Sequence, residues 1–364
     1  MRIPYINLKA QHKQLKDEIL EAISKVLDNS DFILGEKVAE FEEQIAKYCG
    51  TKYAIGVNSG TDALFLVMKS LNIGEKDEVI TVPNSFLSTT SSIIATGAKP
   101  VFVDVKDDLN INPELIEEKI TPKTKAILPV HLTGKPADMS PIMDIAQRHN
   151  LYVIEDAAQA LGAEYKGKRV GSFGVVNCFS LHPLKTLSAC GDGGVITTND
   201  EAIYNKLLWL RNIGLKNRNE AEIWGYNSRL DTIQAAILNV KFKYFEEWID
   251  KRRRNARYYI EHLKGYVKLP CEENYERCVY HTFIIQTEDR DRLQEYLLKN
   301  GIETKIHYPI PIHMQKAAVS LGYKKGDFPI AERQANKILS LPVYQELSQI
   351  EMEYIVNIIR KFYT

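Results

Sequence analysis

The first apolar residues of the chain recur at spacings of three and four. Leu15, Ile19, Ile23 and Val26 form one stripe, and a second stripe runs through residues 38, 41, 45 and 48. This period predicts two amphipathic helices. The segment Asp31-Phe-Ile-Leu-Gly35 separates them.

Beyond residue 50 the pattern changes to short apolar, β-rich runs that alternate with helical stretches. Because strands that alternate with helices build βα units, this order predicts an α/β fold with a mostly parallel, seven-stranded sheet flanked by helices. The run at 151–154 is apolar at every position, which is typical of a strand covered on both faces. The expected strands are 53–57, 78–82, 100–105, 126–130, 151–155, 175–180 and 194–198.

A different arrangement begins near residue 245. A charged helical run at 245–263 precedes a strand-like segment at 282–286, a helix near 290–300 and a proline-rich connection at 309–311. We therefore expect a large α/β domain over residues 1–245 and a smaller C-terminal α+β domain over 246–364, with the N-terminal helix packed on the small domain. The run Lys251-Arg-Arg-Arg254 is expected to be a solvated helix face.

Composition and charge narrow the classes of function. The 364 residues include 47 Lys and Arg and 47 Asp and Glu, so the formal net charge is zero, which argues against a nucleic-acid-binding protein. The five cysteines form no C-x-x-C pair and no zinc-ligand spacing, so no metal site is expected. No signal peptide and no apolar run of about 20 residues is found, so we expect a cytoplasmic protein without membrane contact.

Polar residues gather beyond the carboxyl ends of the expected strands, where parallel sheets bind their ligands. The segment Gly56-Val-Asn-Ser-Gly-Thr-Asp-Ala-Leu64 joins a strand to a helix. A helix start offers free N–H groups and the positive end of the helix dipole, so this turn can hold a phosphate. The alternative is that Ser59 or Thr61 only caps the helix.

Two further candidates are an acid and a lysine. Asp156 follows the buried strand, and a buried carboxylate needs a partner such as a protonated ring nitrogen, although a helix cap is the alternative. Lys185 lies in a Pro- and Gly-rich turn region between Ser180 and Gly194. Most loop lysines are solvated, but a lysine near a desolvated site can form a Schiff base.

The order of these groups resembles that of a known enzyme class. A phosphate-type turn near residue 60, Phe86, Asp156, Ser180 and Lys185 follow one another as in fold-type-I pyridoxal-phosphate (PLP) enzymes. From residue 4 to residue 362 the chain is similar to the DegT/DnrJ/StrS family of sugar aminotransferases. The motifs that carry the resemblance are 35–41, 59–64, 129–138, 155–159, 180–185, 225–229 with 234–236, and 326–332 with 341–342.

The resemblance implies a role for each position. Lys185 is expected to bind the cofactor covalently and to move protons, and Asp156 to hold the pyridine nitrogen. The other implied cofactor-binding residues are Gln159 at the phenolic oxygen, Phe86 on the ring face, Gly60, Thr61 and Ser180 at the phosphate, and Asn227 at the phosphate of the partner subunit's site, which makes a homodimer part of the active site. Candidates for substrate contacts, for which a structural role is the alternative, are His182, His307 and Tyr308, with His281 and His313.

The implied reaction is transamination from L-glutamate, through the pyridoxamine form of the cofactor (PMP), to a keto-sugar. A nucleotide-linked sugar such as a 3-keto-6-deoxyhexose is expected, in amino-sugar biosynthesis for a surface glycan such as lipopolysaccharide O-antigen or for a secondary metabolite. The alternatives are a keto-sugar acid without a nucleotide, such as 8-keto-Kdo, a sugar dehydratase and a non-catalytic cofactor-binding regulator. Lys185 opposes the dehydratase, in which histidine replaces this lysine, and the absence of a G-x-G-x-x-G motif opposes a Rossmann oxidoreductase.

Overall fold

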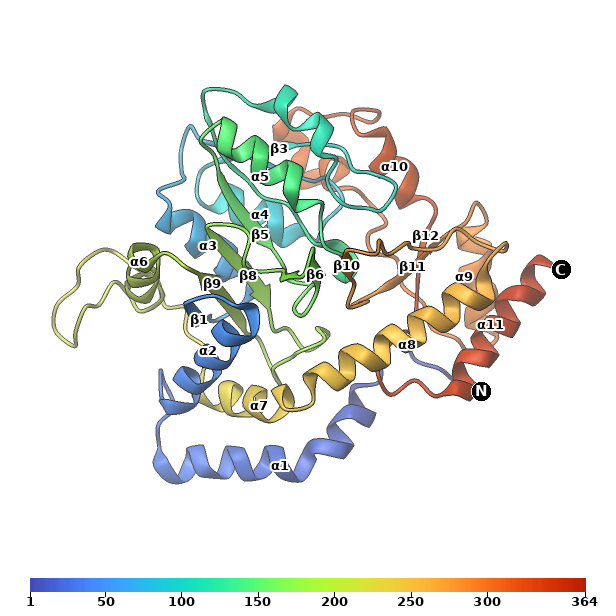
Figure 1. Cartoon of the computed structure of the whole chain (residues 1–364), viewed down its shortest axis with the longest axis horizontal. Coiled ribbons are helices and arrows are strands. Elements are labelled where there is room, and N and C mark those ends of the chain that lie inside the picture. The colour runs from blue at the N-terminus through green and yellow to red at the C-terminus, as the bar shows by residue number, and fades with distance from the viewer.

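The computed structural model describes all residues, 1–364, and its centre is a seven-stranded sheet (Figure 1). The strand order is β1-β9-β8-β5-β4-β2-β3, and only β9 runs antiparallel to its neighbours. The predicted mostly parallel sheet is therefore confirmed. Its strands are β1 (Tyr53–Val57), β2 (Glu78–Thr81), β3 (Lys99–Phe102), β4 (Thr124–Ile127), β5 (Tyr152–Asp156), β8 (Val176–Ser180) and β9 (Gly194–Thr198).

Helices cover both faces of this sheet, as the continuously apolar strands require. On one face, α3 (Gly60–Ser70) packs against α4 (Leu87–Ala95) and α6 (Glu201–Arg211). On the other face lie α2 (Glu36–Cys49), α5 (Met139–Arg148) and α7 (Thr232–Phe242) (Figure 1). Strand β5 is buried from its second residue onward, so Asp156 at its end is reached only from the carboxyl edge of the sheet.

The N-terminal helix α1 (Leu8–Asn29) lies along α7 and not on the small domain, which corrects the prediction (Figure 1). Its apolar stripe is buried against α2 and α7, and the Tyr244 hydroxyl donates a hydrogen bond of 2.5 Å to Glu18 Oε1. The segment before α1 joins the small domain instead, where Ile3 is fully buried and pairs with Ile302. An apolar stripe determines which face of a helix is buried but not which element covers it.

Helix α8 (Phe245–Leu263) runs from the large domain into the small one (Figure 1). Phe245 and Trp248 are buried in the core beside the sheet, whereas Tyr259 and Leu263 are buried among the C-terminal elements. The predicted boundary at residue 245 thus falls at the start of one continuous helix and stays a prediction. The C-terminal elements are β11 (Phe283–Gln286), antiparallel to β12 (Ile338–Leu341), with α9 (Arg290–Lys299), α10 (Pro329–Ala335) and α11 (Gln349–Tyr363).

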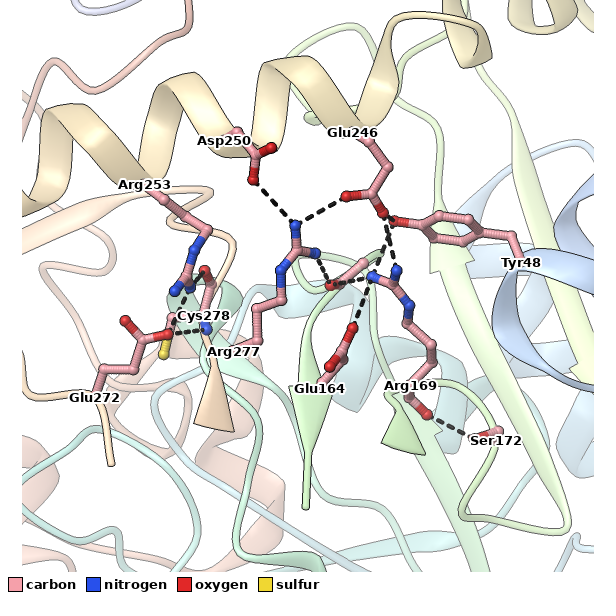
Figure 2. A network of polar contacts seen from close by, with 11 residues as sticks. Tyr48, Glu164, Arg169, Ser172, Glu246, Asp250, Arg253, Glu272, Arg277 and Cys278 are labelled. Carbon is pink, nitrogen blue, oxygen red and sulfur yellow. Dashed lines mark hydrogen bonds and ion pairs between the residues drawn. The ribbon is translucent and has the colours of Figure 1, made fainter. Parts of the chain in front are cut away.

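A network of charged side chains joins α8 to the large domain (Figure 2). It links the helix to the hairpin of β6 (Glu164–Tyr165) and β7 (Lys168–Arg169) and to β10 (Glu276–Arg277), which pairs with β6. Arg277 Nη2 donates to Glu246 Oε2 at 2.8 Å and to Asp250 Oδ1 at 3.2 Å, and Arg169 Nη2 donates to Glu246 Oε1 at 3.0 Å. Ion pairs as well as apolar packing therefore set the orientation of α8.

The run Lys251-Arg-Arg-Arg254 on α8 is not the solvated face that its charge suggested. Arg252 is only 3% exposed, and Arg253 pairs with Glu272 at 2.5 Å; of the four residues only Arg254 is exposed. Arg252 lies three residues after the buried Ile249 and four before the buried Ala256. These spacings put it on the buried stripe of the helix, and this position outweighs its charge.

Candidate active site

A cavity of about 380 Å³ lies between the carboxyl ends of β5 and β8 and the small domain. Its size is typical of a small-molecule site. The large domain contributes the starts of α3 and α4 and the loops after β5 and β8, and the small domain contributes α8 and the segments 281–282, 307–308 and 343–344. The structure brings together at this cavity Gly60, Thr61, Phe86, Asp156, Gln159, Ser180, His182, Lys185, His281, His307 and Tyr308.

Asp156 is held through both its backbone and its side chain. Its N–H donates to Pro129 O at 3.0 Å, and its carboxylate accepts hydrogen bonds from Thr89 Oγ1 at 2.7 Å and from Ala158 N–H at 3.2 Å. No helix follows Asp156, so the capping alternative does not apply. Burial raises the pKa of Asp156, and the two hydrogen bonds and the charge of Lys185 oppose this shift. A cation in the cavity would therefore stabilise the ionised carboxylate further.

Lys185 lies in the turn after β8 and lines the same cavity. Its backbone N–H donates to His182 O at 2.8 Å, which closes the turn. Burial lowers the pKa of Lys185 from 10.5 to about 8, and Asp156 acts in the opposite direction. Near neutral pH this lysine thus has a much larger fraction of the neutral, nucleophilic amine than a solvated lysine has.

The helix start that the sequence analysis connected with a phosphate forms one end of the cavity. Ser59 is the N-cap of α3, and its Oγ accepts a hydrogen bond from Asp62 N–H at 3.0 Å. Capping leaves the N–H groups of Gly60 and Thr61 in the first turn, where the helix has no acceptor for them. A Cβ at Gly60 would lie 2.7 Å from Ser180 Cβ, so glycine is what lets α3 begin this close to β8. This end of the cavity therefore favours an anion.

Gln159 and two aromatic side chains form the wall beside Asp156. Gln159 Oε1 accepts a hydrogen bond from Thr133 N–H at 2.8 Å, and its Nε2 lies 3.3 Å from the Tyr308 hydroxyl. Phe86 directly precedes α4, is 54% exposed, and has its ring centroid 5.8 Å from that of Tyr308. An exposed aromatic ring on a cavity wall offers a flat apolar surface on which another ring can stack.

Two histidines contribute to the small-domain side of the cavity. The buried Nδ1 of His281 has no hydrogen-bond partner, and burial, together with the charges of Lys185 and Arg252, lowers the pKa of His281 well below its usual value. Burial also lowers the pKa of His307 to about 4, and its Nδ1 lies 2.9 Å from Ser340 Oγ. Both imidazoles are therefore neutral near pH 7 and can form hydrogen bonds to a ligand without adding charge.

These features fit a planar, phosphorylated pyridine such as PLP. The start of α3, with its close approach to Ser180, suits the phosphate. Phe86 suits the ring face, the buried Asp156 carboxylate suits a protonated ring nitrogen, and the Lys185 amine suits an aldehyde carbon.

Comparison with known proteins identifies the family. The profile of the DegT/DnrJ/EryC1/StrS aminotransferase family matches residues 13–360. The chain belongs to this family. The predicted family, its fold and its aminotransferase class are thereby confirmed.

Among relatives of this DegT-family chain, a "Pleiotropic regulatory protein" of Geobacillus stearothermophilus is 44% identical, over 100% of this chain and 99% of that protein. UDP-N-acetyl-3-dehydro-alpha-D-glucosamine 3-aminotransferase of Acidithiobacillus ferrooxidans is also 44% identical, over 99% and 97% of the two chains. Among solved structures, DesV of S. venezuelae in complex with a ketimine intermediate matches with a TM-score of 0.97 and 40% identity, over 99% of this chain and 98% of that one.

Two predicted residues of this DegT-family chain lie outside the cavity. Asn227 is exposed in the segment between α6 and α7, where it pairs with Asn212. His313 is buried in the C-terminal part of the chain, with its Nε2 3.0 Å from Glu332 Oε1, so its interactions are structural. No helix of the chain is long and apolar enough to cross a membrane, and no group of three or more His, Cys, Asp or Glu side chains is placed to hold a metal ion.

The cavity is also lined by residues that the sequence analysis did not assign to a site, among them Tyr5, Thr89 and Arg252. Tyr5 reaches the cavity because the chain before α1 packs on the small domain, and no local pattern indicates this. Thr89 donates to Asp156 from the first turn of α4, where a small polar residue is unremarkable in sequence. Arg252 carries a usable signal, because it falls on the apolar stripe of its helix.

Proposed function

We propose that this protein is a PLP-dependent aminotransferase that moves the amino group of L-glutamate to a nucleotide-linked keto-sugar. The observation that carries the proposal is that Lys185, with its lowered pKa, and Asp156 share a cavity that ends at the start of α3. Family membership supports the reaction type. The A. ferrooxidans relative is named for amination at C-3 of a UDP-sugar, which supports a 3-keto sugar as the acceptor.

Five residues are proposed to hold the cofactor. When bound, PLP supplies an electron sink that stabilises negative charge at the carbon that loses a proton. The N–H groups of Gly60 and Thr61 and the hydroxyl of Ser180 bind its phosphate. Phe86 stacks on the ring. Gln159 donates from Nε2 to the phenolic oxygen, since its Oε1 already accepts a backbone hydrogen bond.

Asp156 and Lys185 are proposed to carry the proton chemistry. The Asp156 carboxylate keeps the pyridine nitrogen protonated, because a cation there offsets the burial that raises the carboxyl pKa. The Lys185 amine, with a pKa of about 8, takes the proton from the α-carbon of the donor and delivers it to the cofactor. His182, His307 and Tyr308 bind hydroxyl groups of the sugar.

We propose further that the enzyme is a homodimer in which Asn227 binds the phosphate in the partner's site. The segment between α6 and α7 projects from the body of the molecule (Figure 1), and Trp224 in it is 93% exposed. A large exposed apolar side chain on a projecting segment is typical of a surface that a partner covers. A cytoplasmic location is proposed as well, since the five free cysteines suit a reducing compartment.

A regulatory protein without catalysis is the second candidate, because the G. stearothermophilus relative carries a regulatory name. The two candidates differ in whether an amino donor reacts. A keto-sugar acid without a nucleotide, such as 8-keto-Kdo, is the alternative acceptor, and a panel of acceptors separates it from a nucleotide-linked sugar. The presence of Lys185 argues against a dehydratase, in which histidine replaces this lysine.

The proposed activity predicts that the purified protein is yellow with PLP and that L-glutamate bleaches the visible band as PMP forms. A nucleotide-linked 3-keto sugar should then restore the band. Lys185→Ala should prevent bleaching because it removes the group that moves the proton. Borohydride reduction and peptide mapping check the attachment at Lys185. A band that persists with every amino donor would overturn the enzyme assignment and favour the regulator.

A further inference from the structure

Arg252 of α8 is a buried cation that forms no ion pair: the charge of Glu346 raises the pKa of Arg252, but no carboxylate accepts a hydrogen bond from its guanidinium. Its Nε donates to Gln345 Oε1 at 3.0 Å, and its Nη1 donates to the carbonyl oxygens of Tyr280 and His281, each at 3.3 Å. All three acceptors are neutral. Arg252 is 3% exposed, and burial lowers its pKa to about 10, so it remains charged at neutral pH. A buried charge without a directly bound counter-charge is costly, and proteins normally pair it.

The neighbouring arginine shows the ordinary arrangement. Arg253 points toward Glu272, with which it pairs at 2.5 Å, and it also donates to Cys278 O at 2.6 Å (Figure 2). Arg211, also buried, pairs with Glu42. The fold thus provides a directly paired carboxylate for each of these arginines, but Arg252 has no such direct partner.

Arg252 lines the cavity at its small-domain side, and its second terminal nitrogen, Nη2, donates to no protein group. The only acidic residues that line the cavity are Asp156 and Asp192, whereas Lys185, His281 and His307 lie on it with Arg252. Asp156 is bound by Thr89 and Ala158 in the large domain. The small-domain side of the cavity therefore presents a positive charge and neutral imidazoles to a ligand. No acidic side chain of the small domain lines the cavity.

We infer that Arg252 binds a carboxylate of the amino donor. The inference rests on the proposed transaminase function and adds the residue that selects a carboxylate-bearing donor. A guanidinium with a free terminal nitrogen can bind a carboxylate through charge-assisted hydrogen bonds, which are about twice as strong as neutral ones. The donor's carboxylate supplies the direct partner that Arg252 lacks within the protein. A sugar diphosphate is the other anion that the enzyme meets, and the experiment separates the two.

The test uses the holoenzyme and glutarate, which is the five-carbon donor skeleton without its amino group and cannot react. Calorimetry gives the Kd of glutarate for the wild type, Arg252→Gln and Arg252→Lys. Arg252→Gln removes one partner of a buried charge pair, so it should raise the Kd of glutarate by at least about 30-fold. Arg252→Lys keeps the positive charge but loses the planar, forked set of guanidinium donors, so its Kd for glutarate should lie between those of the wild type and Arg252→Gln.

Two arginines of the same helix are matched controls. Arg253→Gln also removes a largely buried guanidinium, but one that pairs with Glu272. Arg254→Gln makes the same change of charge on the exposed face of the helix. Both should bind glutarate within about threefold of wild type. In steady state, Arg252→Gln should raise KM for L-glutamate and leave KM for the nucleotide-linked acceptor unchanged.

Equal glutarate binding in wild type and Arg252→Gln would overturn the inference. A raised KM for the nucleotide-linked acceptor alone would assign Arg252 to the diphosphate, which also overturns it. If Arg252→Gln fails to fold, Arg252→Lys decides the matter, because it retains the buried charge. Failure of L-glutamate to bleach the wild type would overturn the proposed function itself, whereas bleaching of Arg252→Gln at wild-type glutamate concentrations would overturn only this inference.

Discussion

At the scale of single residues, the lowered pKa of Lys185 has a direct kinetic consequence. Only the neutral amine attacks the PLP aldehyde, so the rate at which the apoenzyme takes up PLP should rise with pH and level off above a midpoint of about 8. Stopped-flow absorbance at a series of pH values measures this midpoint. A midpoint near 10.5, the ordinary lysine value, would contradict the assignment of a buried, activated amine.

Asp156→Asn serves as the matched control for this measurement. The Asp156 carboxylate raises the pKa of Lys185, because a negative charge favours the ammonium form. Removing that charge should therefore move the midpoint below the wild-type value. A midpoint that moves upward would show that the two groups do not interact as the geometry indicates.

At the scale of elements, the charged network holds α8 and with it Arg252. Arg277 bridges β10 to Glu246 and Asp250 on α8 and also donates to Gly162 O at 3.0 Å (Figure 2). Arg277→Met leaves the two carboxylates of α8 without this partner, so it should lower the free energy of unfolding by about 2 kcal/mol. Urea unfolding measures the change.

Arg292→Met is the control for this network. Arg292 forms its one ion pair with Asp289 at the start of α9, its guanidinium lies 5.5 Å from the centroid of the Phe362 ring, and its side chain is 76% exposed. Solvent screens such a pair, so its loss should cost below about 1 kcal/mol. If Arg277→Met costs no more than Arg292→Met, the network does not stabilise the position of α8.

At the scale of the whole molecule, the proposed homodimer can be tested by mixing two defects. Lys185→Ala and Asn227→Ala subunits carrying different tags are co-expressed, and the mixed dimers are measured. If Asn227 acts in the partner's site, one of the two sites of each mixed dimer is intact, so the isolated mixed dimers should have about half of the wild-type activity. If Asn227 acts only within its own chain, the mixed dimers should have no more than half the activity of the Asn227→Ala enzyme.

The strands and the large-domain part of the site could be predicted because their signals are local. A continuously apolar run such as 151–154 indicates a strand buried on both faces, and a parallel sheet places the residue after such a strand at its ligand-binding edge. Asp156, Lys185 and Gly60 follow from this rule together with the family resemblance, and all three line one cavity.

The small-domain part could not be predicted in the same way, because it depends on where whole elements pack. The apolar stripe of α1 was compatible with packing on either domain, and only the tertiary structure shows that α1 packs along α7. The tertiary structure also places Tyr5, which precedes α1, at the cavity. On α8, successive residues point about 100° apart, so the orientation of the helix decides which of three adjacent arginines is buried. The amino-acid sequence by itself thus determined the sheet and the reaction class, and it indicated the two residues that we propose for the proton chemistry. Tertiary packing decided that Arg252, and neither Arg253 nor Arg254, lines the cavity, because burial belongs to the assembled elements and not to the residue.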